Sequence, residues 1–214
     1  MWDFLPSHFD RIVFSSWQHL SLVLQCLALA TVLAVGLAAL VVYRSRILSS
    51  AANMLSAIGL TIPAFALVGI VIAPLGFGIA PAVAVVTFFA ILPILCNTIV
   101  GLLGVDPAIV DSARGIGLGR VRTFLRVELP LAWPVILGGI RVSAQMVMGI
   151  AAIAAYVLGP GLGGFFFSGL SRLGGANPLE SVLTGVIGVV ILALLLDLVL
   201  VGFGRLTTPR GIRV

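Results

Sequence analysis

The chain has 214 residues, of which 61% are hydrophobic and 9% are charged. An average soluble domain is about 45–50% apolar and about 25% charged, so this composition excludes a soluble globular domain and a disordered chain. The formal net charge of +5 does not indicate a nucleic-acid-binding protein, because the chain is poor in acidic residues rather than rich in basic ones.

Residues 1–19 form an N-terminal segment that precedes the first long apolar stretch. Hydrophobic residues recur in it at near-helical spacing, and Trp2 and Trp17 are typical of a membrane interface. We expect a short helix on the outer face of a membrane, with a frayed tail as the alternative. A basic region at the start is missing, so a signal peptide is not predicted. His8 and His19 are expected to be surface or interfacial residues.

Five stretches are long and apolar enough to cross a membrane, which takes about 20 residues. Each is apolar on all sides, unlike a helix at the surface of a soluble protein. Prolines interrupt three of them, and the carbonyls that they free need neighbouring helices or a water-filled path. The sequence therefore predicts an all-α polytopic membrane protein with a transmembrane domain at 20–204. Its spans lie at residues 20–43, 52–75, 79–104, 131–158 and 182–204.

The arginines predict the orientation of these spans. Nine of them fall on one side of a five-span topology, and only Arg11 and Arg172 fall on the other. Basic residues are retained in the cytoplasm, so we expect the N-terminus outside and residues 205–214 as a cytoplasmic tail. The nine are Arg44, Arg46, Arg114, Arg120, Arg122, Arg126, Arg205, Arg210 and Arg213.

The cytoplasmic segment 105–130 is the one connection rich in charge. Asp106-Pro107 is a helix start signal, and Gly115, Gly117 and Gly119 are expected to end that helix. A second helix is predicted for residues 120–127, with its stop at Pro130. The glycine spacing does not fit a dinucleotide-binding loop, and a chain without lysine has no phosphate-binding loop of the GxxxxGK[ST] kind.

The same segment resembles the signature of the membrane subunits of bacterial type I ABC importers. That signature reads EAA, three residues, Gly, nine residues, I-x-L-P. Residues 111–113 stand at EAA, Gly117 at the glycine, and Val127, Leu129 and Pro130 at I-x-L-P. The resemblance implies a cytoplasmic coupling helix that docks on an ATPase subunit. The coupling residues that it implies are Ala108, Asp111, Ser112, Ala113, Arg114, Gly115, Gly117, Leu129 and Pro130.

Residues 61–78, 91–117, 129–141 and 159–164 are similar to the osmoprotectant branch of that family. The resemblance implies a five-helix importer domain without catalytic residues, in a bacterial inner or plasma membrane. It implies import of a quaternary amine such as glycine betaine, choline or carnitine. The implied partners are two ATPase subunits, a second permease chain (identical or homologous) and an external substrate-binding protein. This chain would bind no cofactor, because ATP and Mg²⁺ belong to the ATPase.

Two ionisable residues, Arg141 and Asp197, are predicted deep in the spans at matched depth. We expect an ion pair between them; separate partners, or a proton relay, are the alternatives. Asn97, Thr98 and Gln145 are candidates for lining a translocation path or for interhelical hydrogen bonds. Cys26 and Cys96 are expected to be small buried hydrophobes, and no cluster of ligands for a metal is present.

Three other functions compete with an osmoprotectant permease. One is a permease of the same kind for another small polar solute. A stand-alone secondary transporter or channel is disfavoured because five spans do not divide into equal repeats and only one acid lies in a span. An intramembrane hydrolase would need a reactive pair inside the bilayer, whereas both histidines precede the first predicted span.

Overall fold

A computed structural model describes residues 4–175 and 177–208, and within these ranges all regular structure is helical. A π-helical turn, Phe124–Glu128, joins α7 to α8, and a 3₁₀ turn, Ala155–Val157, follows α8. The helices are α1 Phe4–Ser7, α2 Phe9–Arg44, α3 Arg46–Leu60, α4 Ala64–Leu75, α5 Ile79–Leu103, α6 Pro107–Gly115, α7 Arg120–Thr123, α8 Leu129–Ala154, α9 Gly163–Ser171 and α10 Pro178–Thr207.

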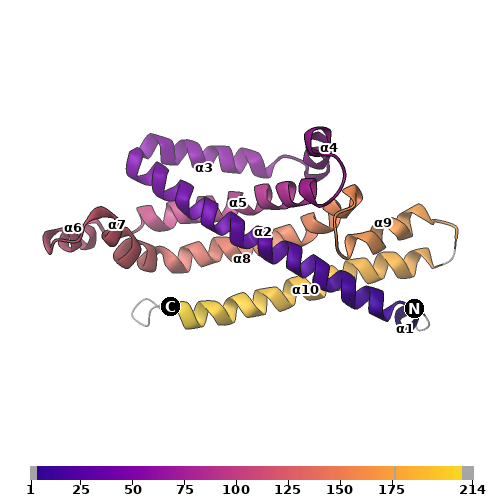
Figure 1. Ribbon diagram of the computed structural model, residues 1–214. Coiled ribbons are helices and arrows are strands. Elements are labelled where there is room, and N and C mark those ends of the chain that lie inside the picture. The colour runs from indigo at the N-terminus through magenta and orange to yellow at the C-terminus, as the bar shows by residue number, and fades with distance from the viewer. Residues whose placement is uncertain (1–3, 176, 209–214) are drawn as a thin grey trace.

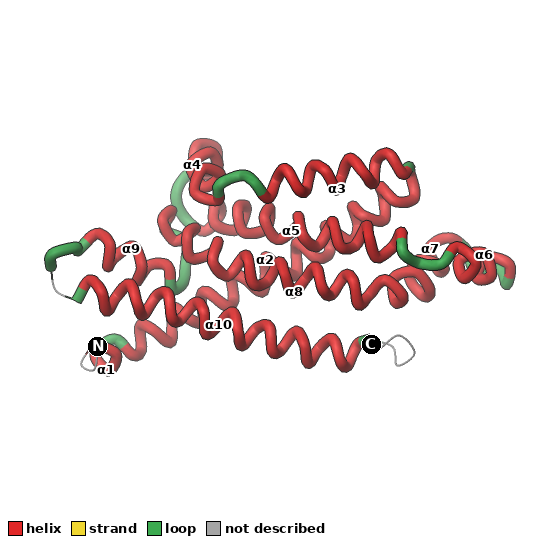
Figure 2. The backbone as a smooth tube through the Cα atoms, turned by 180° about the vertical axis from the view of Figure 1, so that it is seen from behind, coloured by secondary structure: helices red, strands yellow, loops and turns green. Residues whose placement is uncertain are grey.

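The long helices α2, α5, α8 and α10 run lengthwise through an elongated molecule (Figure 1). α6 and α7 protrude at one end, near the C-terminal end of α10, while α1 and α9 lie at the other end. Figure 2 shows the same arrangement from behind, with α3 and α4 on the outside of α5. The core is centred on α5, which packs against α8 and α2 through buried aliphatic side chains such as Val86, Ile94, Ile136 and Val147.

α5 and α8 approach closely because glycine stands at their contact. A Cβ atom on Gly139 of α8 would lie 2.6 Å from the Cβ of Asn97 and 3.0 Å from the carbonyl oxygen of Pro93, both on α5. A Cβ on Gly101 of α5 would lie 3.2 Å from the backbone of Ala132. Small residues at helix contacts are the usual way to pack helices in a membrane, where burial of apolar surface supplies little driving force.

The predicted boundary after residue 19 is wrong, because α2 runs without a break from Phe9 to Arg44. Residues 9–19 are its first three turns and continue directly into the predicted first span. His19, expected at the surface, is fully buried, and its Nε2 donates to the carbonyl oxygen of Met148 at 3.1 Å. A tertiary partner on α8 explains how a polar residue fits there, and hydropathy alone could not reveal it.

The predicted second span, 52–75, does not form one helix. α3 and α4 are bent by 97° at a break around Ile62-Pro63, and only together do they meet the length and hydropathy of a span. α3 runs along α5 with the small residues Ser49, Ser56 and Gly59 buried, and α4 turns across the end of the bundle (Figure 1). The predicted span joins most of α3 to α4, and it starts later than α3, whose first turns include the polar residues Arg46, Ser49 and Ser50.

The predicted helix stop at Pro130 is also wrong. The chain continues through the π-helical turn into α8, where Pro130 occupies the first turn. The backbone N–H of Leu129 bonds back to the carbonyl of Phe124, five residues earlier. A proline in a helix leaves a backbone group without its usual partner, and a π-type turn can absorb that mismatch.

Four helices among the described residues are individually long and apolar enough to span a membrane, and the bent pair α3–α4 brings the number to five. The protein is a multi-pass, all-α membrane protein, as the composition predicted.

Candidate functional site

The protruding helix α6 begins as the sequence predicts. The side chain of Asp106 caps it by accepting a hydrogen bond from the N–H of Ala108 at 2.8 Å, and Pro107 occupies the first position. An aspartate cap satisfies a backbone donor at the helix start, and proline gives up no hydrogen bond there. The segment can therefore fold as a defined helix outside the spans.

Gly117 ends α6 in a Schellman motif. The N–H of Leu118 bonds to the carbonyl of Ala113 at 3.2 Å, and the N–H of Gly117 bonds to that of Arg114 at 2.9 Å. Gly117 has a φ of +89°, in the region that strongly favours glycine. The glycine of the importer signature thus has a backbone role here, because it lets the chain reverse after α6.

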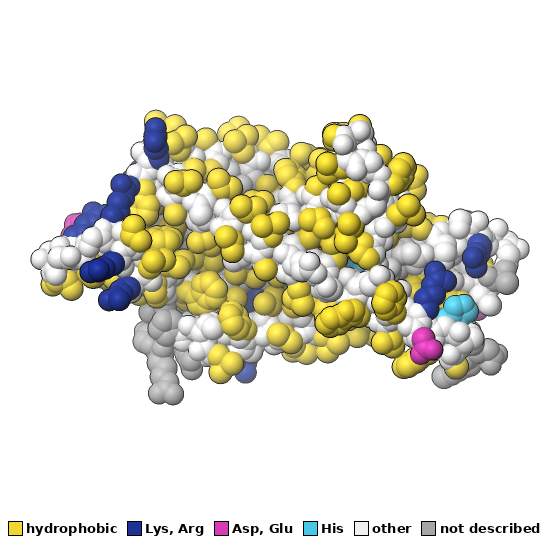
Figure 3. All heavy atoms as spheres, viewed as in Figure 1, with side chains coloured by type: hydrophobic (Ala, Val, Ile, Leu, Met, Phe, Trp, Pro, Cys, Tyr) yellow, Lys and Arg dark blue, Asp and Glu magenta, His cyan; other side chains and the backbone are white. Residues whose placement is uncertain are grey.

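α6 presents a mixed surface at the tip of the molecule. Ala108, Asp111, Ser112 and Arg114 are exposed, and the carboxylate of Asp111 lies 3.7 Å from the Arg114 guanidinium. Figure 3 shows several arginine side chains around this end, with others at the opposite end. Large apolar side chains are also exposed on α6 and α7 and in the turns that follow them: Ile109, Ile116, Val121 and Leu125.

Not all of the predicted coupling residues lie on that surface. Ala113 is buried, so it packs within the chain rather than on the exposed side of α6. Gly115 is exposed at the end of α6. Leu129 and Pro130 lie in the first turn of α8, in a small hollow beside Trp133 and the end of α10. The structure thus separates the two halves of the signature, with the first on the exposed helix α6 and the second in the first turn of α8.

A polar cluster that sequence reasoning missed fastens this protrusion to α2. The hydroxyl of Tyr43 donates to a carboxylate oxygen of Glu128 at 2.5 Å, and Glu128 is almost fully buried. The guanidinium of Arg120 lies 4.7 Å from the centre of the Tyr43 ring and donates to the Tyr43 carbonyl at 3.2 Å. Glu128 was visible as the only glutamate of the segment, but its partner is 85 residues away.

The structure brings Arg141 and Asp197 together across α8 and α10. Nε and Nη2 of the guanidinium each donate to one carboxylate oxygen at 2.9 Å, which is a bidentate pair. Gln145, one turn further along α8, also interacts with the Asp197 carboxylate. Neither charged side chain is fully enclosed by its own chain, since 39% of Arg141 and 21% of Asp197 are exposed.

Asn97 and Thr98 form hydrogen bonds within α5 instead of between helices. The Asn97 amide donates to the carbonyl of Pro93 at 2.9 Å, and the Thr98 hydroxyl to that of Ile94 at 2.7 Å. The first bond goes to the carbonyl of the proline that lies inside α5, which runs unbroken through it. Thr98 is fully buried, so in this conformation it does not line an open path.

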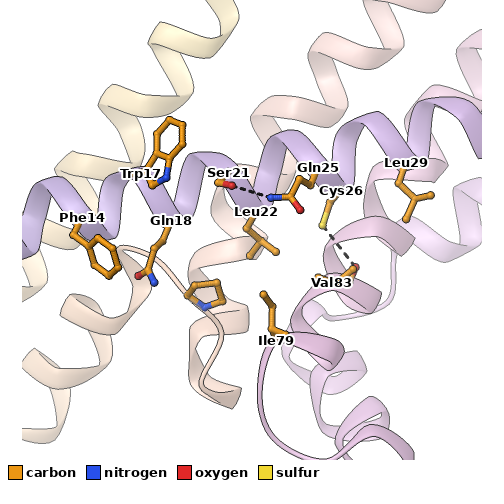
Figure 4. Close-up of a pocket in the computed structure, with 11 residues that line it drawn as sticks. Phe14, Trp17, Gln18, Ser21, Leu22, Gln25, Cys26, Leu29, Ile79 and Val83 are labelled. Atoms are coloured by element: carbon orange, nitrogen blue, oxygen red, sulfur yellow. Dashed lines mark hydrogen bonds between the residues drawn. The ribbon is translucent and has the colours of Figure 1, made fainter.

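A hollow of about 520 Å³ lies at the other half of the molecule, between α2 and the start of α5 (Figure 4). Gln25 donates to the hydroxyl of Ser21 at 2.8 Å there, and the thiol of Cys26 points to the carbonyl of Val83 at 3.9 Å. Cys26 is buried as expected, while Cys96 is partly exposed. Among the described residues no group of three or more potential metal ligands occurs.

Solved structures share this fold. Two inward-facing crystal forms of the MetNI methionine ABC transporter superpose with TM-scores of 0.76 and 0.78. The first comparison covers 92% of this chain and 96% of the other at 20% identity, and the second covers 95% and 99% at 18% identity. The arrangement of helices is therefore shared with a chain of this ABC transporter.

Closer relatives are similar along nearly their whole length. The choline transport system permease protein OpuBB of Bacillus subtilis (strain 168) is 33% identical over 99% of this chain and 95% of its own. The osmoprotectant import permease protein OsmW of Salmonella typhimurium (strain LT2) is 36% identical over 92% of each chain. The carnitine transport permease protein OpuCB of Listeria monocytogenes is 33% identical over 98% of this chain and 94% of its own.

The helices from α3 to α10 and the polar cluster around Glu128 lie in a part of the chain that matches a known family. Residues 30–210 match the family described as the binding-protein-dependent transport system inner membrane component. This chain is a member of that family and is thus a membrane permease subunit of a transport system.

Proposed function

We propose that this chain is the permease subunit of an ATP-driven importer for small quaternary-amine osmoprotectants such as glycine betaine, choline or carnitine. The names of the relatives support the substrate class, since choline, carnitine and osmoprotectants recur among them. A permease for a different small polar solute is the alternative.

The observation that carries the coupling mechanism is the exposed surface of α6. It combines small residues with apolar and charged ones at the tip of the molecule, and Asp106 and Gly117 fix both ends of its helix. Such a surface fits docking into a groove of a separate ATPase subunit, which would hold the ATP and Mg²⁺. Closure of two ATPase subunits would then push α6 and rock the spans as rigid bodies, giving alternating access.

The proposal extends to the orientation of the chain in the membrane and to its remaining partners. The C-terminal ends of α2 and α10 lie at the same end of the bundle as the protruding helix α6 (Figure 1). Most of the arginines also lie there, so that end would face the cytoplasm (Figure 3). The N-terminal end would face outward, where an external binding protein delivers the substrate. A second permease chain, identical or homologous, would complete the transport path.

The test is a matched pair of substitutions to arginine at exposed serines at opposite ends of the molecule. Ser112→Arg places a large cation on the α6 surface, and Ser171→Arg makes the same change at the end of α9. We expect Ser112→Arg to abolish co-purification of the ATPase subunit and ATP-dependent uptake of glycine betaine and choline into proteoliposomes. Ser171→Arg should retain the ATPase subunit. Uptake that persists without any ATPase subunit would overturn the proposal.

A further inference from the structure

The half-open ion pair inside the spans has an unusual setting. Arg141 is at the middle of α8, yet more than a third of its side chain is not covered by this chain. Charged residues in membrane-spanning helices are costly, and they face a bundle interior or a water-filled cavity rather than lipid. The open side of the Arg141–Asp197 pair is therefore a surface that water or another protein covers.

The pair lies on α10 between two sets of close contacts. Nearer the cytoplasmic end, the two helices touch through Trp133 with Thr207 and through Leu137 packed against Gly204. Beyond Asp197, the close contacts of α10 pass to α9, where Gly185 and Gly188 accommodate Leu162 and its neighbours. The ion pair and Gln145 are thus polar contacts between α8 and α10 inside the spans.

The surface beside the pair continues along α8 as an open strip. Val142 and Gln145 are exposed, and the position of a Cβ on Gly149 has no atom within 4 Å. These residues recur at three- and four-residue spacing and so share one side of the helix. The strip is small or apolar except at its centre, where Gln145 and the two charges lie together.

The chemistry of this centre matches a zwitterion. The bonds to Asp197 use Nε and Nη2, so the Nη1 amino group of Arg141 lies outside the bidentate contact. A guanidinium binds carboxylates well through its several donors, and a carboxylate attracts an ammonium group. A substrate that carries both charges a few bonds apart can meet both partners at once, whereas a simple anion or cation meets one attraction and one repulsion.

We propose that Arg141, Gln145 and Asp197 form a weak binding point on the transport path for quaternary amines that carry a carboxylate. The Arg141 guanidinium meets the substrate carboxylate, and Asp197 with Gln145 meets its ammonium end. This inference rests on the proposed function, in which the path runs between two permease chains. It adds a source of selectivity for betaines over choline in the permease itself.

The first experiment asks whether the strip faces water. In the complete transporter with Cys26→Ala and Cys96→Ala, Gln145→Cys is compared with Leu195→Cys. Leu195 is exposed on α10 only two residues from Asp197, but it points to the opposite side of that helix. A water-soluble trimethylammonium-ethyl methanethiosulfonate should label Gln145→Cys at least about tenfold faster, because thiols react as hydrated thiolates.

The second experiment asks whether the substrate binds there. Glycine betaine should slow the labelling of Gln145→Cys at a concentration about tenfold lower than choline, since one charge-assisted contact is worth at least that ratio. Arg141→Gln should remove this difference between the two compounds. Thr184→Val, which changes a hydroxyl bonded within α10, should leave it intact.

The outcomes separate this inference from the proposed function. Equal labelling of Gln145→Cys and Leu195→Cys, or equal protection by the two amines, would overturn the inference even when uptake is normal. A transporter that imports none of glycine betaine, choline and carnitine would overturn the proposed function, whereas the labelling contrast would still decide whether the strip faces water.

Discussion

α5 and α10 are two spans of similar composition with opposite surroundings. Their most apolar windows have mean hydropathies of 2.5 and 3.0, yet 61% of the residues in the α5 window are buried and only 6% of those in the α10 window. In a membrane, hydropathy reports that a helix crosses, because lipid is as apolar as a protein core. Which helix lies at the centre depends on small residues and on specific contacts.

The two helices are accordingly held by different means. α5 is enclosed by α2, α3 and α8 at close packing distances, with glycines at the contact points. α10 touches α8 along one seam and α9 along another, and its contacts with α8 include an ion pair and a tryptophan hydrogen bond. If this contrast is right, damage to packing should dominate at α5, and loss of polar contacts should dominate at α10.

The largest loss of stability is expected from Gly139→Val at the α5–α8 contact. A Cβ there would overlap Asn97 and the Pro93 carbonyl, and the new methyl groups would force the helices apart. Overpacking costs about 1–3 kcal/mol, and we expect about 3 kcal/mol because backbone atoms are involved. The measurement is the thermal midpoint of the purified subunit in detergent.

The neighbouring Gly138→Val is the matched control for that change. A Cβ on Gly138 has no atom within 4 Å, so the same substitution should leave the thermal midpoint of the subunit nearly unchanged. Equal loss of stability in the two variants would show that valine harms α8 itself, and the close α5–α8 contact would lose its importance.

The fold class could be predicted from the sequence because composition and the length of apolar stretches decide it. The start of α6 at Asp106-Pro107 and its glycine stop also follow from local chemistry, which acts within a few residues. The break between α3 and α4 could not be predicted in this way. Its consequence, an inward polar side of α3, depends on contact with α5.

In the candidate site, too, the sequence predicts local features but not the contacts between distant residues. The spacing of the importer signature located α6, but it could not show that Ala113 is buried while Ser112 is exposed. Matched depth suggested the partnership of Arg141 and Asp197, whereas the partial exposure of the pair depends on how the helices pack around it. Tyr43 and Glu128 went unnoticed because their contact joins residues far apart in the chain.

A smaller loss of stability is expected from truncating one aliphatic side chain of the same size in α5 and in α10. Ile94 of α5 is completely buried, and Leu195 of α10 is 53% exposed. Ile94→Ala leaves a cavity that neighbours cannot fill, and it should cost about 2 kcal/mol. Leu195→Ala should change the stability of the isolated subunit by less than about 0.5 kcal/mol. Similar losses at both sites would contradict the contrast between α5 and α10.

The ion pair is expected to contribute less than core packing, because its side chains are partly exposed. Arg141→Gln, Asp197→Asn and the double variant form a cycle, and coupled neighbours show interaction energies of about 0.5–3 kcal/mol. We expect about 1 kcal/mol, with the double variant less destabilised than the sum of the singles. Strict additivity of the unfolding free energies in lipid bicelles would show that the pair does not tie α8 to α10.

The smallest effect on stability is expected where the C-terminal end of α10 meets α8. Trp133→Phe removes the hydrogen bond of 2.8 Å to the hydroxyl of Thr207, while a ring remains to meet Phe203. A hydrogen bond contributes about 0.5–1.5 kcal/mol, and this exposed one should lie at the lower limit. Thr207→Val should cost a similar amount, and the double variant should cost no more than either single. A loss of stability as large as that of Ile94→Ala would mean that the contact of α10 with α8 depends mainly on this one hydrogen bond. Polar contacts at α10 would then matter as much for stability as core packing at α5.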